Sequence, residues 1–499
     1  MMDTQSSWVW GHQYGALLIL LSVNLVLRSL NSFRGAANTL TLLAEHHSFR
    51  FPGYSSIRQW FLRLGLYELQ RSRERRSDWL YVTDMTLEVG AQKCLVVLGI
   101  AQAHWQQLVC TAEGTLSYTD MDLLAVKVMS QSKGEQIQTV LEEVSERVGV
   151  PRQIVSDQGS DLYKGIRLYA QTQQTIHVTY DVTHQCARLL KAELREDETY
   201  QAFARRCTLS RQQLQQSPLS FLMPPVQRAK ARYMNIDTLL EWAKRVSCYQ
   251  QQQDFSLINP VHSLDTDALN ALASQLPAEF LEALAPIQHQ QFPHGSAFHQ
   301  ALRACLPDHL VRAVGPLIRQ TADFGRRSFE AKLGWLSEYR DRLTPVIEIL
   351  SLVRVVQEQL KHQGLTSHST VDFLKHPQTQ DNRLTSRAMA FKAKLIDYLE
   401  RETHALPDDT ALLASSDIIE SLFGKYKLFS AKSPLKHMGH LLLSLPLLTA
   451  NLSTEVVKTA LETVSFDDVQ QWYHQHFGQS PLAKRRQAFQ PMSINTESA

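Results

Sequence analysis

The chain has 499 residues, of which 44% are hydrophobic and 20% are charged, and this composition excludes a disordered or collagen-like protein. Its length exceeds what one hydrophobic core organises, so several domains are expected. Because 51 Lys and Arg residues stand against 49 Asp and Glu residues, the net charge is only +2, and a nucleic-acid partner would have to bind a local basic surface.

The cysteines and the most apolar segment indicate the cellular environment. The six cysteines are scattered without a CxxC pair, which favours reduced intracellular thiols over a disulfide framework or a zinc ribbon. The apolar stretch 15–28 contains Asn24 and is shorter than the roughly 20 residues of a membrane span, so we expect a buried helix there. These features predict a cytoplasmic protein that does not contact a membrane.

Residues 1–75 predict a helical domain that contains a helix-turn-helix. One helix is expected near 32–46 and a second over 55–65, with a Pro-Gly break between them and Gly65 as the helix end. An ordinary small helical bundle would give the same pattern. In a helix-turn-helix, the open face of the second helix contacts DNA. The residues expected on that face are Arg58, Gln59 and Arg63.

An arginine-rich segment follows the second helix. Four of the six residues in 71–76 are arginines. They would form either a solvated linker or a set of phosphate contacts beside the DNA-reading helix. The four candidates for DNA binding are Arg71, Arg73, Arg75 and Arg76.

Residues 76–195 alternate between strand-like and helical patterns. This order predicts a mixed sheet of five strands with helices packed on it. The expected strands are 79–84, 93–101, 105–112, a strand ending at 157, and 176–181. The expected helices are 134–148, 159–168 and 184–194.

The rest of the chain predicts helices. Residues 196–407 have few glycines and many leucines and alanines, which is typical of an all-α block. A helix over 415–427, capped by Ser415 or Ser416, carries Asp417 and Glu420. We expect 408–450 to return to the α/β core and 451–499 to form a helical tail.

Two carboxylates lie at the ends of predicted strands. Asp84 ends the first strand and Asp157 ends the fourth. In a ribonuclease-H-type strand order these two strands are neighbours, so the two acids would form an oxygen site for a divalent cation. Such a pair repels itself without metal, which favours a functional role. Aspartates at strand ends are, however, also ordinary turn residues.

With a third acid, these motifs resemble those of the DDE transposases in the ribonuclease-H-like superfamily. The matching stretches are Tyr81-VTDMT, Ile154-VSDQGSDLYKG and Ser416-DIIESLFGKYK. The pair Asp181 and His184 resembles the C/D-x-x-H element of hAT-like transposases, and a long helical insertion before the glutamate is a feature of that branch.

The resemblance implies a ribonuclease-H-like core interrupted by an all-α insertion. It implies Asp84, Asp157 and Glu420 as the catalytic, metal-binding triad. Two Mg²⁺ or Mn²⁺ ions would activate a water or a 3′-hydroxyl and stabilise the leaving oxygen during DNA strand cleavage and strand transfer. It also implies double-stranded DNA (element ends and target) as partner and a homodimer or higher oligomer as the assembly.

Several neighbouring acids have simpler interpretations. Asp161 is expected as an acid at the start of a helix, and Asp417 as a capping-region acid in preference to the third metal ligand. Asp181 and His184 would either fix local geometry or contact DNA near the site.

Other candidates for DNA contact lie after the third acid and in the insertion. Lys425 and Lys427 suit phosphate contacts, although lysines near a helix end also complement its dipole. In related transposases an aromatic side chain of the insertion stacks on a flipped base, which makes Trp335 and Trp242 candidates, with core packing as the alternative.

Two other classes of function stay open. The chain could be a transposase-derived DNA-binding protein that has lost catalysis, although all three acids are intact. It could also be a ribonuclease-H-fold nuclease that cuts nucleic acid without joining it.

Overall fold

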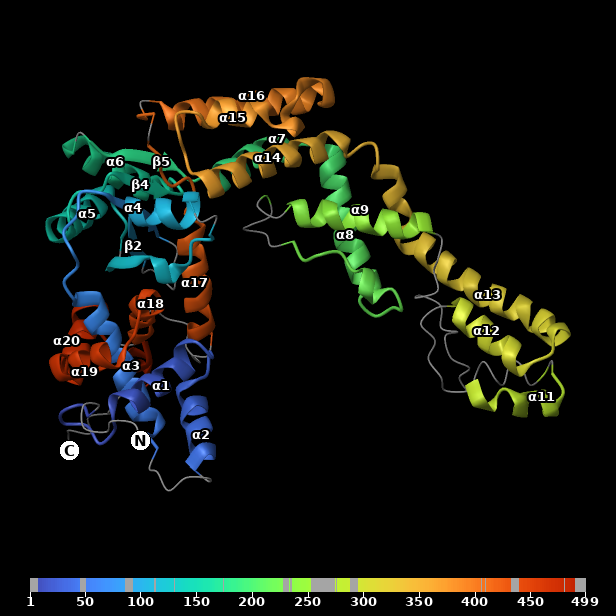
Figure 1. The fold of residues 1–499 in the computed structure, drawn as a ribbon, viewed down its shortest axis with the longest axis horizontal. Helices are drawn as coiled ribbons and strands as arrows, with labels where there is room; N and C mark the ends of the chain where they lie inside the picture. The colour runs from blue at the N-terminus through green and yellow to red at the C-terminus, as the bar shows by residue number, and fades with distance from the viewer. Residues whose placement is uncertain are drawn as a thin grey trace, which may run out of the picture. The chain divides into compact units, whose positions relative to one another are not determined.

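The computed structural model describes residues 8–44, 51–85, 93–111, 114–129, 131–173, 175–227, 233, 236–252, 274, 276–287, 295–404, 406–408, 410–431, 439–479 and 481–489. The chain divides into two units (Figure 1). Three stretches form the first unit, Met1–Gln185, Val355–His376 and Leu395–Ala499, and two form the second, Cys186–Arg354 and Pro377–Lys394. The first unit therefore joins the N-terminal helices, the sheet and the C-terminal helices, which the sequence analysis treated as separate domains.

A five-stranded mixed sheet lies in the first unit, in the order β3-β2-β1-β4-β5. The strands are β1 (Trp79–Asp84), β2 (Lys93–Ala101), β3 (Asp122–Met129), β4 (Gln153–Ser156) and β5 (His177–Tyr180). Strand β2 pairs antiparallel with β1 and β3, whereas β4 pairs parallel with β1 and β5. The mixed sheet and the neighbouring positions of the first and fourth strands are as the sequence predicted.

The third strand was placed wrongly from the sequence. Residues 105–112, expected as a strand, begin at the end of helix α4 (Gln102–Trp105) and continue into the π-helix η1 (Gln106–Thr111). Trp105 and Val109 are buried while Gln107 between them is exposed, whereas in a strand all three side chains would lie on one face. The strand that pairs with β2 is instead Asp122–Met129, at the edge of the sheet.

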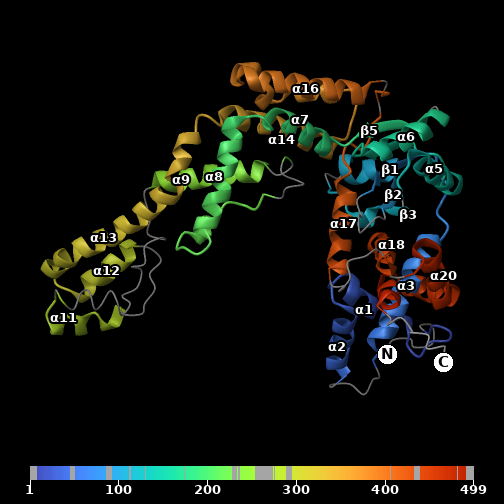
Figure 2. The same ribbon diagram turned by 180° about the vertical axis from the view of Figure 1, so that it is seen from behind.

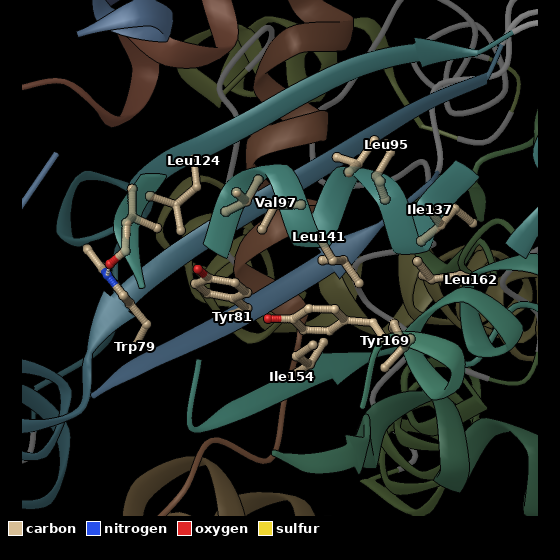
Figure 3. Close-up of a cluster of buried hydrophobic side chains, with 14 of the residues drawn as sticks. Trp79, Tyr81, Leu95, Val97, Leu124, Ile137, Leu141, Ile154, Leu162 and Tyr169 are labelled. Carbon is tan, nitrogen blue, oxygen red and sulfur yellow. Dashed lines mark hydrogen bonds between the residues drawn. The ribbon is translucent and has the colours of Figure 1, made fainter. Parts of the chain in front are cut away.

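Helices α5 (Gly134–Val148) and α6 (Ser160–Thr172) enclose a hydrophobic core against the sheet (Figure 3). The two helices approach closely, since a Cβ atom on Gly165 would lie 2.5 Å from Ile137. Within this core the hydroxyl of Tyr81 donates to the Gly149 carbonyl over 2.9 Å. This packing holds β1 and β4, whose ends carry two of the predicted catalytic acids.

The N-terminal and C-terminal helices form a bundle around α3. The bundle comprises α1 (Ala16–Leu27), α2 (Phe33–Ala44), α3 (Tyr54–Gln70), α18 (Ser444–Thr449), α19 (Thr454–Thr463) and α20 (Phe466–Phe477), with α3 in contact with the other five (Figure 1). Buried residues follow one another along α3 and leave no broad exposed face: Ile57, Trp60, Phe61, Leu62, Leu64, Leu66 and Glu68. A recognition helix needs such a face, so α3 is a core helix and not the DNA-reading helix that the sequence predicted.

Gly65 does not end α3, contrary to the prediction. The helix continues to Gln70, and a Cβ atom at Gly65 would lie only 2.2 Å from the Leu443 carbonyl oxygen. The glycine therefore permits the close approach of the 3₁₀-helix η8 (His440–Leu443) to α3.

The described part of the second unit consists of helices and connecting segments, in agreement with the predicted all-α block. Its helices are α8 (Glu198–Leu214), α9 (Ile236–Gln252), α11 (Ala278–Ala283), α12 (Gly295–Cys305) and α13 (Asp308–Leu333). Three helices contribute residues to both units: α7 (Val182–Leu194), α14 (Thr344–Gln363) and α16 (Ser386–Thr403). The remaining α-helices belong to the first unit: α15 (Ser369–Lys375), α17 (Asp417–Ser430) and α21 (Pro481–Ala488).

The apolar N-terminal segment forms α1, which has 12 residues. Among the described residues, no helix combines the length and the apolar character that crossing a bilayer requires.

Candidate active site

Asp84 and Asp157 leave the sheet at the same edge. Asp84 is the last residue of β1 and is 5% exposed, and Asp157 directly follows β4. Thr83 and Ser156 are partners in the parallel register, so the two acids are the next residues on adjacent strands. Because neighbouring strands are about 4.8 Å apart, this register brings the two carboxylates close together.

Glu420 comes to this edge from helix α17, which contacts β1 (Figure 2). It lies in the first turn of the helix with its side chain 44% exposed. One carboxylate oxygen, Oε1, is 3.0 Å from Nε2 of His184 at the start of α7. The third predicted acid is therefore held beside the first two by a histidine.

The three carboxylates affect one another electrostatically. Burial, assisted by the negative charges of Asp157 and Glu420, raises the pKa of Asp84 to about 7. The Met85 N–H, which donates to Asp84 Oδ1 over 2.5 Å, and the charge of His184 only partly oppose this shift. The site thus carries more negative charge than its neighbours balance.

His184 is the cation nearest to these acids. Burial lowers its pKa, but the hydrogen bond to Glu420 and the charges of Asp181, Glu420 and Asp157 outweigh burial and raise the pKa to about 9. His184 is therefore protonated at neutral pH, and its Nε2–H donates to Glu420.

A single buried carboxylate, Asp181, connects the starts of α7 and α17. Its side chain is fully buried, and Oδ1 accepts a hydrogen bond of 2.7 Å from the His184 amide. Oδ2 accepts from both the amide and the hydroxyl of Ser416, the hydroxyl bond being 2.9 Å long. Because Ser416 precedes α17 and His184 binds Glu420, Asp181 fixes the two groups that position the third acid.

Gln153 also helps to position α17, by binding the backbone of Leu413 just before that helix. Sequence reasoning missed this residue. Its side chain is fully buried in β4, where Nε2 donates to the Leu413 carbonyl over 2.6 Å and Oε1 accepts from the Leu413 amide over 2.9 Å. These two bonds attach the segment before α17 to the sheet. A glutamine in an otherwise apolar strand was the signal that could have revealed it.

The donor set matches what a hard divalent cation prefers, because carboxylate oxygens are the usual ligands of Mg²⁺. The excess negative charge around Asp84 is the feature that a cation would balance. Within the described residues, however, no group of three or more His, Cys, Asp or Glu side chains is already spaced to hold a metal ion. The hydrogen bond to His184 engages only Oε1 of Glu420, so a cation bound by all three acids could take the other carboxylate oxygen while this bond is kept.

Two neighbouring acids are paired elsewhere. Asp161, in the first turn of α6, accepts from the Ser132 hydroxyl over 2.5 Å and lies 3.6 Å from Lys93 Nζ. Asp417 forms an ion pair with Lys361. These contacts agree with the roles of helix-start and capping-region acids.

The first half of the arginine segment is engaged inside the first unit. Arg71 Nε lies 2.7 Å from Glu68 Oε2, and Glu68 is only 2% exposed. Arg73 lies 3.5 Å from the same carboxylate and 3.3 Å from Asp122. Both side chains, expected as DNA contacts, therefore balance a buried acid.

The second half of the segment also has local partners. Arg76 contacts Asp78 at 2.9 Å and Glu74 at 2.8 Å. Arg75 donates to the Glu146 carbonyl over 3.2 Å. The segment is thus charge-paired in this structure, where the sequence analysis expected either a solvated linker or phosphate contacts.

The candidates on α3 differ in exposure. Arg63 donates from Nε to the Val464 carbonyl over 2.6 Å and from Nη2 to the Leu461 carbonyl, so its guanidinium group joins α3 to the end of α19. Arg58 is half-buried, and burial lowers its pKa, whereas Gln59 is exposed.

The two lysine candidates lie on α17. Lys427 is exposed there, and Lys425 is half-buried.

The two tryptophans of the helical block make packing contacts within the second unit. Trp335 donates from Nε1 to Ser210 Oγ over 2.9 Å, and its ring lies 5.6 Å from that of Tyr339. Trp242 donates to the Leu222 carbonyl over 2.9 Å. Both tryptophan side chains are half-buried, and these contacts hold them within the second unit.

Comparison with known proteins includes a distant structural similarity. No family model matches the chain, and no curated protein matches it. Among solved structures, the Drosophila P element transposase in its strand transfer complex aligns over 89% of this chain and 94% of that chain, with a TM-score of 0.35 and 11% sequence identity. A similarity this distant carries no argument about the function of the chain.

Proposed function

We propose that the chain is a DDE transposase with a ribonuclease-H-like core, and that Asp84, Asp157 and Glu420 are its catalytic residues. The observation that carries the proposal is the electrostatic coupling of these three acids, which come from two adjacent strand ends and a helix far along the chain. Groups whose pKa values are shifted by burial together with specific charged neighbours are typical of functional sites. The sequence motifs around the same three residues give the reaction class.

The residues of the site have separate tasks in this proposal. Two Mg²⁺ or Mn²⁺ ions held by the three acids would activate the attacking oxygen and stabilise the leaving oxygen at a DNA phosphodiester. His184 holds a proton on Nε2 and orients Glu420 through the 3.0 Å contact. Lys425 and Lys427, on the same helix as Glu420, would contact the DNA backbone.

The partners follow from the same proposal. The substrates would be double-stranded DNA at the ends of a mobile element and at its target. Pairing of two ends requires a homodimer or a higher oligomer, which we include in the proposal.

A plasmid-cleavage assay tests the function. The plasmid carries the DNA that flanks the coding sequence on both sides, and nicking and covalent joining are measured with Mg²⁺ or Mn²⁺. We expect Asp157→Ala to lower the rate by about a thousandfold or more, because loss of a metal ligand removes several kcal/mol of transition-state stabilisation. The matched variant Asp161→Ala, whose carboxylate pairs with Lys93 and Ser132, should retain most of the activity.

Three outcomes would contradict the proposal in different ways. Absence of metal-dependent nicking by the unmodified protein would favour a DNA-binding protein without catalysis. Cleavage without any joined product would favour a nuclease of the same fold. Equal losses of cleavage rate in the Asp157→Ala and Asp161→Ala variants would contradict the assignment of the three acids as catalytic residues.

A further inference from the structure

A cavity of about 670 Å³ lies against α17 in the first unit. Its walls are the helix pair α4–η1, the segment 114–118, the end of α14 and the first turns of α17. Asp417, Ile418 and Ser421 line it from α17, whereas Glu420 is not among the lining residues and contacts His184 instead. The cavity is therefore separate from the acid site but shares a helix with it.

The floor of the cavity is apolar and its mouth is polar. Side chains that line it and are at most 8% exposed are Trp105, Val109, Leu360, Leu413, Ala414 and Ile418. The ion pair between Lys361 and Asp417 lies at the mouth, with side chains 38% and 41% exposed. Such a gradient suits a ligand with an apolar body and a polar end.

One wall of the cavity has an unusual backbone. Residues Gln106–Thr111 form a π-helix, and the Gly114 amide closes the turn by donating to the Leu108 carbonyl over 2.9 Å. π-Helices are rare and are frequently found at functional sites. Here the π-helix directly follows Trp105 and directs the chain along the cavity wall.

We propose that this cavity binds a small, mainly apolar aromatic molecule of two or three rings, with its rings on the floor and its polar end at the ion pair. The volume lies within the range of small-molecule sites. A nucleobase fits less well, because its hydrogen-bonding edge would meet the apolar floor without partners. The cavity is thus distinct from any contact with DNA bases.

The bound molecule acts as an effector of the acid site. Ser415 and Asp417 line the cavity, and Ser416 between them is held by Asp181, which also holds the amide of His184. A ligand that binds more tightly to one position of the segment 415–417 than to another favours that position. Because Glu420 follows on the same helix, its position would shift with the segment. This regulatory part rests on the proposed function, whereas the binding part does not.

A fluorescence titration with N-phenyl-1-naphthylamine, a neutral two-part aromatic probe, tests the binding. We expect saturable one-to-one binding to the full chain. Ser421→Trp and Thr115→Trp, which fill the cavity from two opposite segments, should each weaken binding by at least about tenfold, a loss of about 1.4 kcal/mol. Leu428→Trp is the matched control, since Leu428 is 45% exposed on the same helix outside the cavity lining and should leave the affinity unchanged.

The orientation of the ligand is tested with the sulfonated analogue 1-anilinonaphthalene-8-sulfonate. With the sulfonate at the mouth, Lys361→Met leaves Asp417 without its cation and should weaken binding of the sulfonate severalfold more than binding of the neutral probe. An equal effect on both probes would overturn the orientation. Probe binding that is unsaturable, or unchanged in both filling variants, would overturn the site itself.

The effector role is tested by the plasmid-nicking rate with and without the neutral probe. We expect a severalfold change of rate in the unmodified protein and no response to the probe in Thr115→Trp. Probe binding without any change of rate would overturn the effector role. If the unmodified protein does not nick DNA at all, the proposed function fails, while the titration still decides whether the cavity binds its ligand.

Discussion

At the edge of the sheet, Asp84, Asp157 and Glu420 lie together with His184 as a nearby cation, and the pKa of Asp84 is raised to about 7. In the segment 71–76, by contrast, each arginine contacts a carboxylate or a carbonyl oxygen. Burial raises the pKa of the buried acid in both regions, but Glu68 is paired with two arginines whereas Asp84 lies beside two further carboxylates.

On the proposed function, the difference separates residues that serve the fold from residues that serve a reaction. Pairing of a buried charge stabilises the folded state relative to leaving that charge alone. An unbalanced cluster costs stability and is retained where chemistry needs it. Substitutions in the two regions should therefore change stability in opposite directions.

The largest effect is expected from removing the buried acid of the arginine segment. Glu68→Gln leaves Arg71 and the nearly buried Arg73 without their main counter-charge and should lower the free energy of unfolding by about 3 kcal/mol. Urea denaturation followed by tryptophan fluorescence measures this. The control Glu74→Gln breaks an exposed pair and should cost less than about 1 kcal/mol. Equal costs would contradict the assignment of Glu68 as the structural acid.

The opposite sign is expected for Asp84→Asn. Because folding raises the pKa of Asp84 from 3.8 to about 7, the protonated form stabilises the fold, and this stability is lost as the pH rises from about 4 to about 7. With a chelator present, Asp84→Asn should therefore be more stable than the unmodified protein by about 2–4 kcal/mol at pH 8 and equally stable near pH 4.

The same urea experiment at the two pH values measures the effect of Asp84→Asn. The exposed acid Asp467 gives the control, since Asp467→Asn should change stability by less than about 1 kcal/mol at either pH. An unmodified protein that is no less stable than Asp84→Asn at pH 8 would show that the acid cluster is already balanced.

A smaller effect is expected from loosening the link between α7 and α17. Asp181→Ala removes acceptors of His184 and Ser416 and should lower the rate of DNA cleavage by about 10- to 100-fold, with KM for DNA unchanged. Asp181→Asn, which keeps one acceptor, should restore part of the rate. The capping residue Asp197 of the second unit is the control, because Asp197→Ala should cost stability but not cleavage rate.

The smallest effect concerns DNA affinity. Lys427→Gln should reduce the slope of log K against log salt by about 1, because one phosphate contact is lost. Arg73→Gln should leave the slope unchanged and lower stability instead, since Arg73 pairs with Glu68 and Asp122. Fluorescence anisotropy of duplex DNA at several salt concentrations distinguishes the two. A reduced slope only in Arg73→Gln would reverse our assignment of these side chains.

The parts of the fold that depend on local pattern could be predicted from the sequence. The strand before Asp84, the strand before Asp157 and the helix that carries Glu420 were all placed correctly, because strand and helix periodicities differ over a few residues. The neighbouring positions of the two strands then followed from the strand order.

The remaining features depend on contacts between distant parts of the chain. Gly65 lies inside α3 and does not end it. A glycine is present there because a Cβ atom would collide with the backbone of Leu443. Arg63 is engaged by carbonyl groups about 400 residues further along the chain. The segment after Trp105 is rich in β-forming residues, but Gln107 is exposed between the buried Trp105 and Val109, against the alternation of a strand. No local pattern contains these partners. Sequence reasoning therefore predicted an exposed DNA-reading helix where α3 is packed in a bundle, and a strand where the chain is helical.

The attachment of Leu413 to Gln153 spans 260 residues. A ribosome adds about 5–20 residues per second, so the third acid is synthesised roughly 10–50 seconds after the strand that it must join. Throughout this interval the emerging polypeptide holds two of the three acids and lacks the helix that brings the third. On the proposed function, the newborn chain therefore has no complete acid site until residue 420 has been translated.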